Sequence, residues 1–325
     1  MRNDRRAKQF WLFWDRFGVF IIFIFVALIF ALIDVRVIQP AQLVSVLTRS
    51  SWVAVAAAGM TFAICSGGFD LSVGSIMSLC GCALAKLIME NGLPTWLAIL
   101  VTLGIAVVCG LINGVLITKL KIQPFVATLA TMLIYDGVTQ TYTGNIGTFI
   151  KTEQYAQLNV LGRSSFIGVP VKIWVVVLVF VIALVMYRNM RFGAKVRAVG
   201  SNEVAARTSG INADRTLMGV YVVTAVTAAL AAILYTSTVQ SASPDAGSGF
   251  ELDAITAVVL GGSALSGGKG NLVGTLIGAI LVAFVKMCLN FIGAPEALHV
   301  IVTGGVLLLA LSITGIRLIT QKEGN

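Results

Sequence analysis

The sequence has few charged residues. Only 11% of its 325 residues are Asp, Glu, Lys or Arg, and 58% are hydrophobic, whereas a soluble protein carries about 25% charged residues. The mean hydropathy is +0.94. This composition excludes an ordinary water-soluble domain and predicts a protein that lies in a lipid bilayer.

The arrangements of residues that most enzymes use are also missing. The single histidine, His299, has no companion, and no Ser/His/Asp or HExxH pattern is present. A GGKG segment ends at Gly270 but is not a Walker A loop, because Ser263 replaces the first glycine and Gly270 replaces the metal-binding hydroxyl. We therefore predict that the chain is not an enzyme and has no catalytic residue, metal site or cofactor.

Neither the cysteines nor the basic residues indicate a further function. The cysteines all lie within apolar blocks, at Cys65, Cys80, Cys82, Cys109 and Cys288, so we expect reduced packing residues. The formal net charge of +9 does not indicate nucleic acid, because the basic residues are spread over interhelical segments without interleaved aromatic residues.

Apolar blocks of about 16 to 24 residues follow one another along the chain, which is close to the length of a helix that crosses a bilayer. They predict an all-α polytopic helical bundle, a single transmembrane domain over 1–325. We expect the first block to remain in the protein as a span, because it is too long for a signal peptide and no small-x-small site follows it. The expected spans, about ten, are 17–34, 51–66, 74–90, 96–118, 123–142, 171–187, 216–238, 252–266, 271–290 and 297–316.

Most of the 23 Lys and Arg residues fall on one side of the membrane when the chain is threaded through these spans. The positive-inside rule then places both termini, including segment 1–16, in the cytoplasm with the basic loop 188–215. Segment 143–170 becomes the long periplasmic loop. Lys86 and Lys286 lie within spans, and we expect both to extend outward as anchors.

The basic loop 188–215 is the longest polar interval. Ser201 or Asn202 can cap a short helix there, and Gly210 can end it. A helix of two turns is marginal alone, and its small exposed face suits a groove on another protein; a solvated basic loop is the alternative. The residues assigned to this candidate contact are Asn202, Glu203, Ala205, Ala206, Arg207 and Gly210.

A weak internal repeat accompanies the spans. The segment GGFDLSVG at 67–74 aligns with GGSALSGG at 261–268, and both copies run through the membrane in the same direction. Parallel repeats of this kind occur in many transporters. Chance similarity between two glycine-rich turns is the alternative.

Asp70 lies in the first of these glycine-rich breaks. An aspartate left in lipid costs about 2.5 to 3.5 kcal/mol, and a break at membrane depth must be buried in protein or face water. We expect Asp70 to cap the helix that begins near Ser72 or Val73, with direct contact to a substrate as the alternative. The break lies either in a cytoplasmic loop or within the membrane.

Uncharged polar side chains occur in the spans that follow. Asn113, Thr128 and Thr131 join Asp70 as candidates for a substrate path, and the two threonines share a helix face. Hydrogen bonding between helices is the alternative use. No charge pair is visible in the middle of the spans, which disfavours proton or sodium coupling and favours a neutral solute.

Two acidic residues, Glu251 and Asp253, stand at the predicted outer start of the span 252–266. They could cap that helix, since a carboxylate there meets the positive end of the helix dipole. They could also contact an external partner protein. The sequence leaves both roles open.

Four motifs, in order along the chain, resemble the ribose-type permease subunits of bacterial ATP-binding-cassette sugar importers. They are GGFDLSVG at 67–74, INGVLITKLKIQPFVATLATM at 112–132, RFGAKVRAVGSNEVAARTSGI at 191–211 and GFELDAITAVVLGGSALSGGKGNLVGTLIGA at 249–279. Phe69 departs from the isoleucine of many relatives. The resemblance covers almost the whole chain.

The resemblance implies a permease that pairs with a second permease subunit in the bacterial inner membrane. Cytoplasmic ATPase subunits would hydrolyse ATP and dock on 202–210, and a periplasmic sugar-binding protein would deliver a monosaccharide, ribose being the best match. A secondary transporter of a small polar solute is the first alternative. A permease of the same kind for another neutral solute, such as a nucleoside or an autoinducer, is the second.

Overall fold

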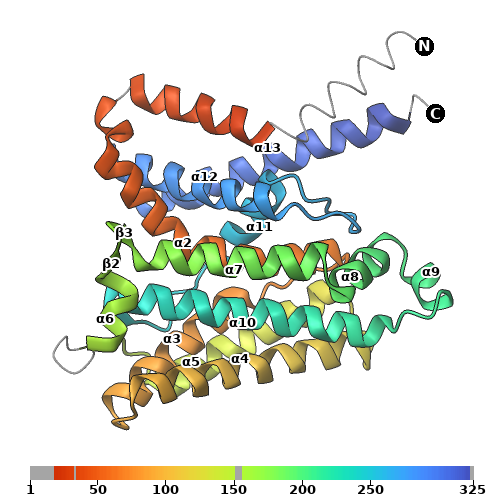
Figure 1. Ribbon diagram of the computed structural model, residues 1–325, viewed down its shortest axis with the longest axis horizontal. Coiled ribbons are helices and arrows are strands. Elements are labelled where there is room, and N and C mark those ends of the chain that lie inside the picture. The colour runs from red at the N-terminus through yellow and green to blue at the C-terminus, as the bar shows by residue number, and fades with distance from the viewer. Residues whose placement is uncertain (1–17, 33, 151–155, 323–325) are drawn as a thin grey trace.

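The computed structural model describes residues 18–32, 34–150 and 156–322. Its helices run side by side along the long axis of the molecule (Figure 1). An unlabelled helix covers Gly18–Leu32, and the elements after it are η1 (Val35–Ile38), α2 (Pro40–Cys65), α3 (Val73–Met89), α4 (Thr95–Thr118), α5 (Pro124–Thr143), β1 (Thr148–Phe149), α6 (Ala156–Arg163), β2 (Ser165–Phe166), β3 (Val169–Pro170), α7 (Val171–Arg188), α8 (Arg191–Ser201), α9 (Glu203–Thr208), α10 (Ala213–Val239), β4 (Ser241–Ala242), α11 (Phe250–Leu260), α12 (Leu272–Phe291) and α13 (Glu296–Lys322). The predicted segment 1–16 lies outside the described residues.

Each predicted span corresponds to a helix, so the helical bundle is confirmed. Five described helices, α2, α4, α7, α10 and α12, are long and apolar enough to cross a membrane. Three predicted boundaries are wrong by more than five residues, and one of them is the end of α13, which lies at Lys322 and not at residue 316. Helix α2 begins at Pro40, well before residue 51, because a proline at the first helical position is compatible with a helix start. Helix α11 ends at Leu260, and its 11 residues extend only about 16 Å.

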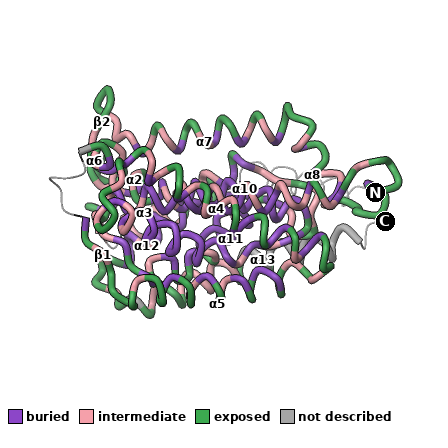
Figure 2. The backbone as a smooth tube through the Cα atoms, turned by 90° about the horizontal axis from the view of Figure 1, so that it is seen from below, coloured by how far each residue is buried: buried purple, intermediate pink, exposed green. Residues whose placement is uncertain are grey.

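Helix α10 forms the centre of the bundle and packs against α2, α3 and α4. Small residues allow this close approach: a Cβ on Gly59 of α2 would collide with Thr227, and a Cβ on Gly110 of α4 would lie 2.7 Å from the Cα of Val222. The central helices are mostly buried, whereas α5 and α7 lie at opposite margins with many exposed residues (Figure 2). These margins carry apolar side chains suited to lipid or to another membrane protein.

The two ends of the bundle differ. Helices α8 and α9 lie at one end, and α6 with β2 and β3 lies at the other (Figure 1); we call them the α9 end and the α6 end. At the α6 end, β1 pairs with β4 (Thr148 opposite Ala242) and β2 pairs with β3. The basic loop was predicted to contain one short helix, and the structure adds α8.

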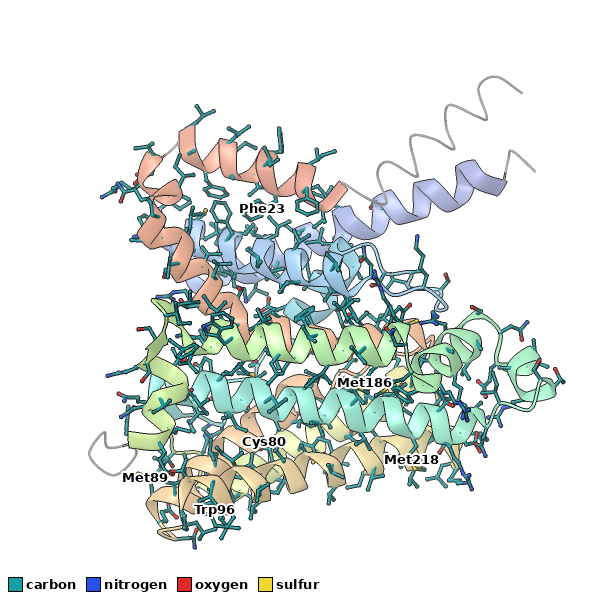
Figure 3. The ribbon with its side chains drawn as sticks, viewed as in Figure 1. Phe23, Cys80, Met89, Trp96, Met186 and Met218 are labelled. Carbon is teal, nitrogen blue, oxygen red and sulfur yellow. The ribbon has the colours of Figure 1, made fainter. Side chains whose placement is uncertain are left out.

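The first helix and the cysteines contribute to packing. Phe23, labelled in Figure 3, lies on the side of the first helix that faces α12, where its ring centroid is 5.3 Å from that of Phe284. All five cysteines are free and buried, which confirms that they are packing residues. Their burial leaves no thiol exposed on the surface of the bundle.

The chain between β4 and α11 enters the bundle. The backbone N–H of Gly247 donates to Ser78 Oγ of α3 at 2.8 Å, and a Cβ on Gly247 would collide with the carbonyl of Gly74. Helix α11 therefore starts beside the beginning of α3 and is a half-length helix. Irregular backbone at this depth requires protein around it, which α3 supplies.

Candidate functional site

The loop between α2 and α3 is the centre of a buried polar network. Helix α2 ends in a glycine turn: Gly67 has φ +86°, and the N–H of Gly68 donates to the carbonyl of Ala63 at 3.0 Å. Asp70 follows and is completely buried. Its Oδ1 accepts from the N–H of Ser72 at 3.1 Å and from Ser72 Oγ at 2.6 Å.

Asp70 does not cap α3 in the predicted way. The N-cap residue is Ser72, whose own side chain makes no capping hydrogen bond. The carboxylate instead joins helices, because its Oδ2 accepts from Thr224 Oγ1 of α10. Asn113 of α4 completes the network by donating to Ser72 Oγ at 2.8 Å. The capping prediction is therefore only partly correct: the carboxylate meets one amide at the helix start, that of Ser72, but sequence spacing does not show that α4 and α10 reach this loop.

The structure brings three of the four predicted path residues, Asp70, Asn113 and Thr128, together at this loop, and Thr131 lies one helical turn further along α5. Asn113 and Thr128 are fully buried and Thr131 is 1% exposed. Thr128 Oγ1 donates to the carbonyl of Pro124 at 2.8 Å and lies 3.4 Å from that of Phe69, and Thr131 Oγ1 donates to the carbonyl of Thr128 at 3.2 Å. Each hydroxyl therefore has a partner within the protein, and the geometry favours a role in holding the loop against α4 and α5.

The second glycine-rich loop, between α11 and α12, is held by different hydrogen bonds from those of the first. Asn271 caps α12 by accepting from the N–H of Gly274 at 3.1 Å, and its Nδ2 donates to the carbonyl of Gly261 at 2.8 Å. Gly262 has φ +82°, one position beyond the residue aligned with Gly67. The two copies thus use a left-handed glycine in different registers.

The two lysines within spans differ from each other. Lys86 Nζ donates to the carbonyl of Tyr142 at 2.9 Å and pairs with Glu90 at 3.3 Å. These contacts lie near a helix end and fit the anchor role predicted for Lys86. Lys286 pairs with Asp253, so the anchor role predicted for Lys286 is wrong. The pair joins α11 and α12 near the ends of the predicted spans 252–266 and 271–290, whereas the prediction concerned charge pairs in the middle of the spans. The sequence did not show the pair because 33 residues separate the two partners.

The acidic residues of α11 are not at an outer rim. Asp253 is 5% exposed and is held by Lys286, so its side chain is not available to an external protein. Glu251 is half-buried, and a Cβ on Gly74 would collide with its carboxylate. The burial of Asp253 does not fit the predicted contact with an external protein, and for Glu251 that contact stays a prediction.

The pair borders a cavity of about 570 Å³ near the α6 end. Aromatic and polar side chains line it together: Trp52 and Tyr235 meet edge to face at 5.6 Å, and Arg49, Asn290 and His299 are also in its wall. The cavity is large enough for several waters. It gives the Lys286 ammonium access to a polar space.

Removing the Lys286 charge is expected to destabilise the protein. Lys286→Met leaves the buried Asp253 carboxylate without its cation, which costs about 3 kcal/mol, the lower end for buried pairs because 37% of the lysine side chain is exposed. Lys286→Met/Asp253→Asn should recover most of this loss. Thermal unfolding of purified protein in detergent measures it. Lys86→Met is the control, since its partner Glu90 is 55% exposed; equal melting temperatures for the two single variants would contradict the assignment.

Helix α9 has the predicted boundaries of a capped helix. Asn202 Oδ1 accepts from the N–H of Ala205 at 2.9 Å, and Gly210 has φ +81° just beyond the helix end. The predicted small exposed face is only partly correct. Ala205 is exposed, but Ala206 is 4% exposed and packs in a small cluster with Val199 and Ala213.

The exposed apolar residue of α9 is Val204, which sequence reasoning missed. It is 72% exposed, whereas its neighbour Ala206 turns inward toward α8 and α10. A helical wheel drawn from Ala206 as the inward residue would have found it, because Val204 is then on the outer side. The helix thus presents Val204 and Ala205 to its surroundings.

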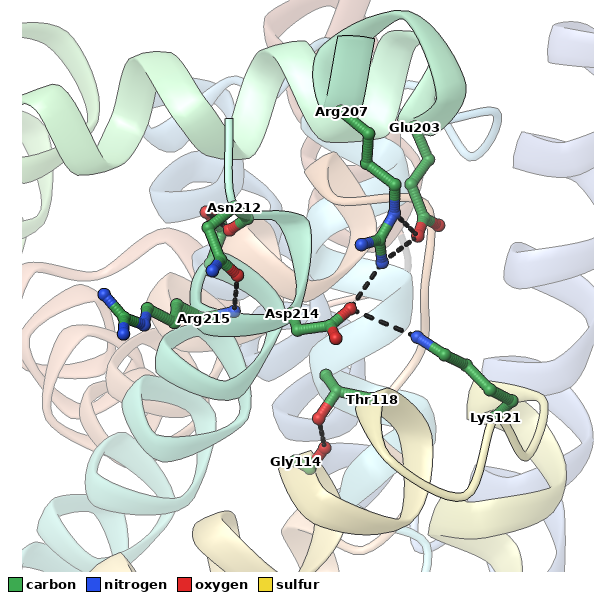
Figure 4. Close-up of polar contacts among 9 residues, drawn as sticks. Gly114, Thr118, Lys121, Glu203, Arg207, Asn212, Asp214 and Arg215 are labelled. Carbon is green, nitrogen blue, oxygen red and sulfur yellow. Dashed lines mark hydrogen bonds and ion pairs between the residues drawn. The ribbon is translucent and has the colours of Figure 1, made fainter. Parts of the chain in front are cut away.

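An ion-pair network ties α9 to two other segments (Figure 4). Arg207 donates to Glu203 Oε1 at 2.7 Å and also to Asp214 in the first turn of α10. Lys121, in the turn between α4 and α5, donates to the same Asp214 Oδ1 at 3.2 Å. The carboxylate of Asp214, and then that of Glu203, raises the pKa of Arg207 above its ordinary value.

Four residues of these networks were not predicted from the sequence: Lys121, Asp214, Thr224 and Tyr221, whose Oη donates to the carbonyl of Phe69 at 3.5 Å. Lys121 and Asp214 lie 93 residues apart, and no local spacing indicates their contact. Tyr221 and Thr224 left a weak signal, because they are polar residues three apart in an apolar span and so share one helix face. Among the described residues, no group of three or more His, Cys, Asp or Glu could hold a metal ion.

Comparison with known proteins shows that the chain is similar in sequence to permease proteins. The family described as branched-chain amino acid transport system / permease component matches residues 42–311. The chain is 40% identical to the ribose import permease protein RbsC of Bacillus subtilis (strain 168), over 91% of this chain and 92% of that protein. It is 39% identical to RbsC of Escherichia coli (strain K12), over 84% and 85%, and 35% identical to the galactofuranose transporter permease protein YtfT of the same strain, over 86% and 82%.

No solved structure matches the chain. The match to the family spans most of the helical bundle, from the beginning of α2 into α13. It includes the Asp70 loop, the Lys286 pair and α9. The chain therefore belongs to the family of the branched-chain amino acid transport system / permease component.

Proposed function

We propose that this chain is the membrane permease subunit of an ATP-driven importer of a monosaccharide, and that ribose is its cargo. The similarity to the ribose import permeases carries this proposal, because it extends over about nine-tenths of both chains at 40% identity. The importer would lie in the bacterial inner membrane and pair with a second permease subunit. A periplasmic sugar-binding protein would deliver the sugar.

The cytoplasmic ATPase would dock on α9. The helix projects at one end of the bundle (Figure 1), and its exposed Val204 and Ala205 offer a small apolar contact between the charged Glu203 and Arg207. An apolar anchor within a polar rim is the usual form of a protein interface. Asn202 and Gly210 fix the two ends of this contact.

The buried Asp70 network would support the path rather than line it. Asp70, Asn113, Thr128 and Thr131 have hydrogen-bond partners within the protein, so none needs a sugar hydroxyl as a partner. Glu251 differs, because it keeps part of its surface exposed at the start of the half-length helix α11. We assign Glu251 as the candidate for sugar contact, since a carboxylate accepts hydrogen bonds from hydroxyl groups.

Transport by the assembled importer tests the function. The chain, its ATPase and its sugar-binding protein would be reconstituted in proteoliposomes, and ATP-dependent uptake of labelled ribose would be compared with uptake of allose and galactofuranose. We expect ribose to accumulate only with ATP and binding protein present. Uptake without ATP, driven by a proton or sodium gradient, would instead indicate a secondary transporter.

The orientation of the bundle has its own test. We propose that the α9 end faces the cytoplasm, because the basic loop 188–215 lies there. In a variant without the five native cysteines, Ser243→Cys near the α6 end should react with an impermeant maleimide in intact cells. Ser201→Cys should react only in inverted membrane vesicles. Labelling of Ser201→Cys in intact cells would reverse the proposed orientation.

A further inference from the structure

Asp214 stands where three segments of the α9 end meet. It belongs to the first turn of α10, and Asn212 caps that helix by accepting from the N–H of Arg215 at 2.9 Å. Its Oδ1 accepts from Arg207 of α9 and, at 3.2 Å, from Lys121 of the α4–α5 turn. One carboxylate oxygen therefore joins α9, α10 and the turn before α5 (Figure 4).

This network adds little to stability. The side chain of Lys121 is 63% exposed and that of Arg207 is 39% exposed, and ion pairs between exposed side chains contribute little to stability. The packing of α9 is also slight, since Ala206 is its only buried residue. A short helix with so few contacts can shift relative to the bundle, and the network then determines which segments move with it.

The turn between α4 and α5, which contains Lys121, has an uncommon backbone conformation. Lys121 has φ +58°, a left-handed conformation that is unfavourable for a residue other than glycine. The turn is closed by a hydrogen bond from the N–H of Ile122 to the carbonyl of Leu116 at 3.2 Å. Because the alternative conformations of such a residue are lower in energy, a change in the Lys121 contact can change the shape of the turn.

The turn leads directly to the Asp70 loop. Pro124, at the start of α5, and Tyr221 of α10 enclose Gly68 so closely that a Cβ there would lie 3.3 Å from Pro124 Cβ and 2.6 Å from Tyr221 Oη. A cavity of about 280 Å³ lies beside these residues and reaches Arg207 and Asp214. The cavity gives the turn space to move, and the contact at Gly68 connects that movement to the loop.

We propose that Asp214 is a positioning residue that transmits displacement of α9 to α5 and to the Asp70 loop through Lys121. The inference rests on the proposed function of α9 as the ATPase contact. When the ATPase displaces α9, Arg207 moves Asp214, Asp214 moves the Lys121 turn, and Pro124 transfers the change to Gly68. Docking of the ATPase does not require this chain of contacts, but coupling of ATP hydrolysis to transport does.

The test uses neutral variants in the reconstituted importer. Asp214→Asn and Lys121→Met should copurify with the ATPase and hydrolyse ATP within about twofold of the original rate, while sugar uptake per ATP falls about tenfold, the size of a typical coupling between sites. Lys121→Arg, which keeps the charge, should restore the ratio. Lys119→Met is the matched control in the same turn, because Lys119 is exposed and forms no ion pair with any described residue.

Three outcomes decide the proposal. A double variant Asp214→Asn/Lys121→Met that is no worse than either single variant supports one shared pathway. An unchanged uptake per ATP in Lys121→Met overturns it, and this variant decides the test even if Asp214→Asn folds poorly. Loss of ATPase copurification in both variants also overturns it, because Asp214 would then be a docking residue. Failure of the unmodified importer to take up sugar is a separate result that counts against the proposed function.

Discussion

Replacing Asp70 by leucine is expected to remove most of the folded protein, whereas Asp70→Asn is expected to retain it. Leucine has a similar size but accepts no hydrogen bond, so the N–H and Oγ of Ser72 lose their acceptor. Each unsatisfied buried donor costs about 1 to 3 kcal/mol. The sum, about 2 to 6 kcal/mol, is a large part of the total stability of about 5 to 15 kcal/mol that a folded protein has.

Asparagine can keep the network because the hydroxyl of Thr224 has a choice of partners. Thr224 Oγ1 donates to Asp70 Oδ2 and also lies 2.9 Å from the carbonyl of Tyr221. If the side-chain amide of an asparagine at position 70 donates to Thr224 Oγ1, the hydroxyl can donate to Tyr221 instead. The remaining oxygen still accepts from Ser72.

The measurement is the yield of monodisperse protein in detergent together with uptake normalised to that yield. Asp245→Asn is the control, because Asp245 is an exposed acidic residue. We expect Asp70→Asn to transport at a rate near that of the unmodified protein, and Asp70→Leu to be recovered in small amounts. A fully folded Asp70→Asn protein without transport would show instead that the carboxylate acts on the substrate.

The helices were predictable because each apolar block had the length of a span and glycine or proline stood near its ends. The exceptions have physical causes. The start of α2 was missed because polar residues such as Gln42, Ser45 and Thr48 interrupt the apolar pattern of its first part. Helix α11 ends at Leu260, where Gly261 and Gly262 begin a turn. A hydropathy pattern does not show where a glycine turn cuts a span.

The sequence was enough to select residues of the candidate site, but it did not show what each residue does there. Sequence reasoning selected Asp70, Asn113 and Thr128, and the structure places them around one loop. It did not find Thr224, which lies 154 residues from Asp70, because contact between distant helices leaves no local spacing. The pair of Asp253 and Lys286 was missed for the same reason, and the contact with an external protein considered for Asp253 is excluded by its burial.

Helix α9 is the clearest case in which identical residues have different environments in the structure. Ala205 and Ala206 are identical residues side by side, so their identity alone does not distinguish their environments. In the structure Ala205 is exposed, while Ala206 faces Val199 and Ala213. A bulky residue at Ala206 would therefore disturb packing inside this chain, and it would not report cleanly on a partner protein.

Val204→Asp is expected to separate the permease from its ATPase without unfolding it. Val204 is 72% exposed, and surface substitutions away from buried contacts usually change stability by about 0.5 kcal/mol or less. If Val204 is the apolar anchor of the interface, burying a carboxylate in its place should cost at least about 2 kcal/mol of binding, or roughly thirtyfold in affinity. Ala206→Trp should instead lower the amount of folded protein.

Copurification of the ATPase from detergent, with the melting temperature of the isolated permease, distinguishes these effects. Ile146→Asp is the matched control, because Ile146 is 71% exposed at the opposite end of the bundle, where the same change should leave the ATPase bound. If Val204→Asp retains the ATPase at the original ratio, the exposed face of α9 is not the docking surface. If Val204→Asp loses the ATPase while the melting temperature is unchanged, the contact depends on the outward-facing side chain of α9. The inward-facing residue, Ala206, is not changed in that variant.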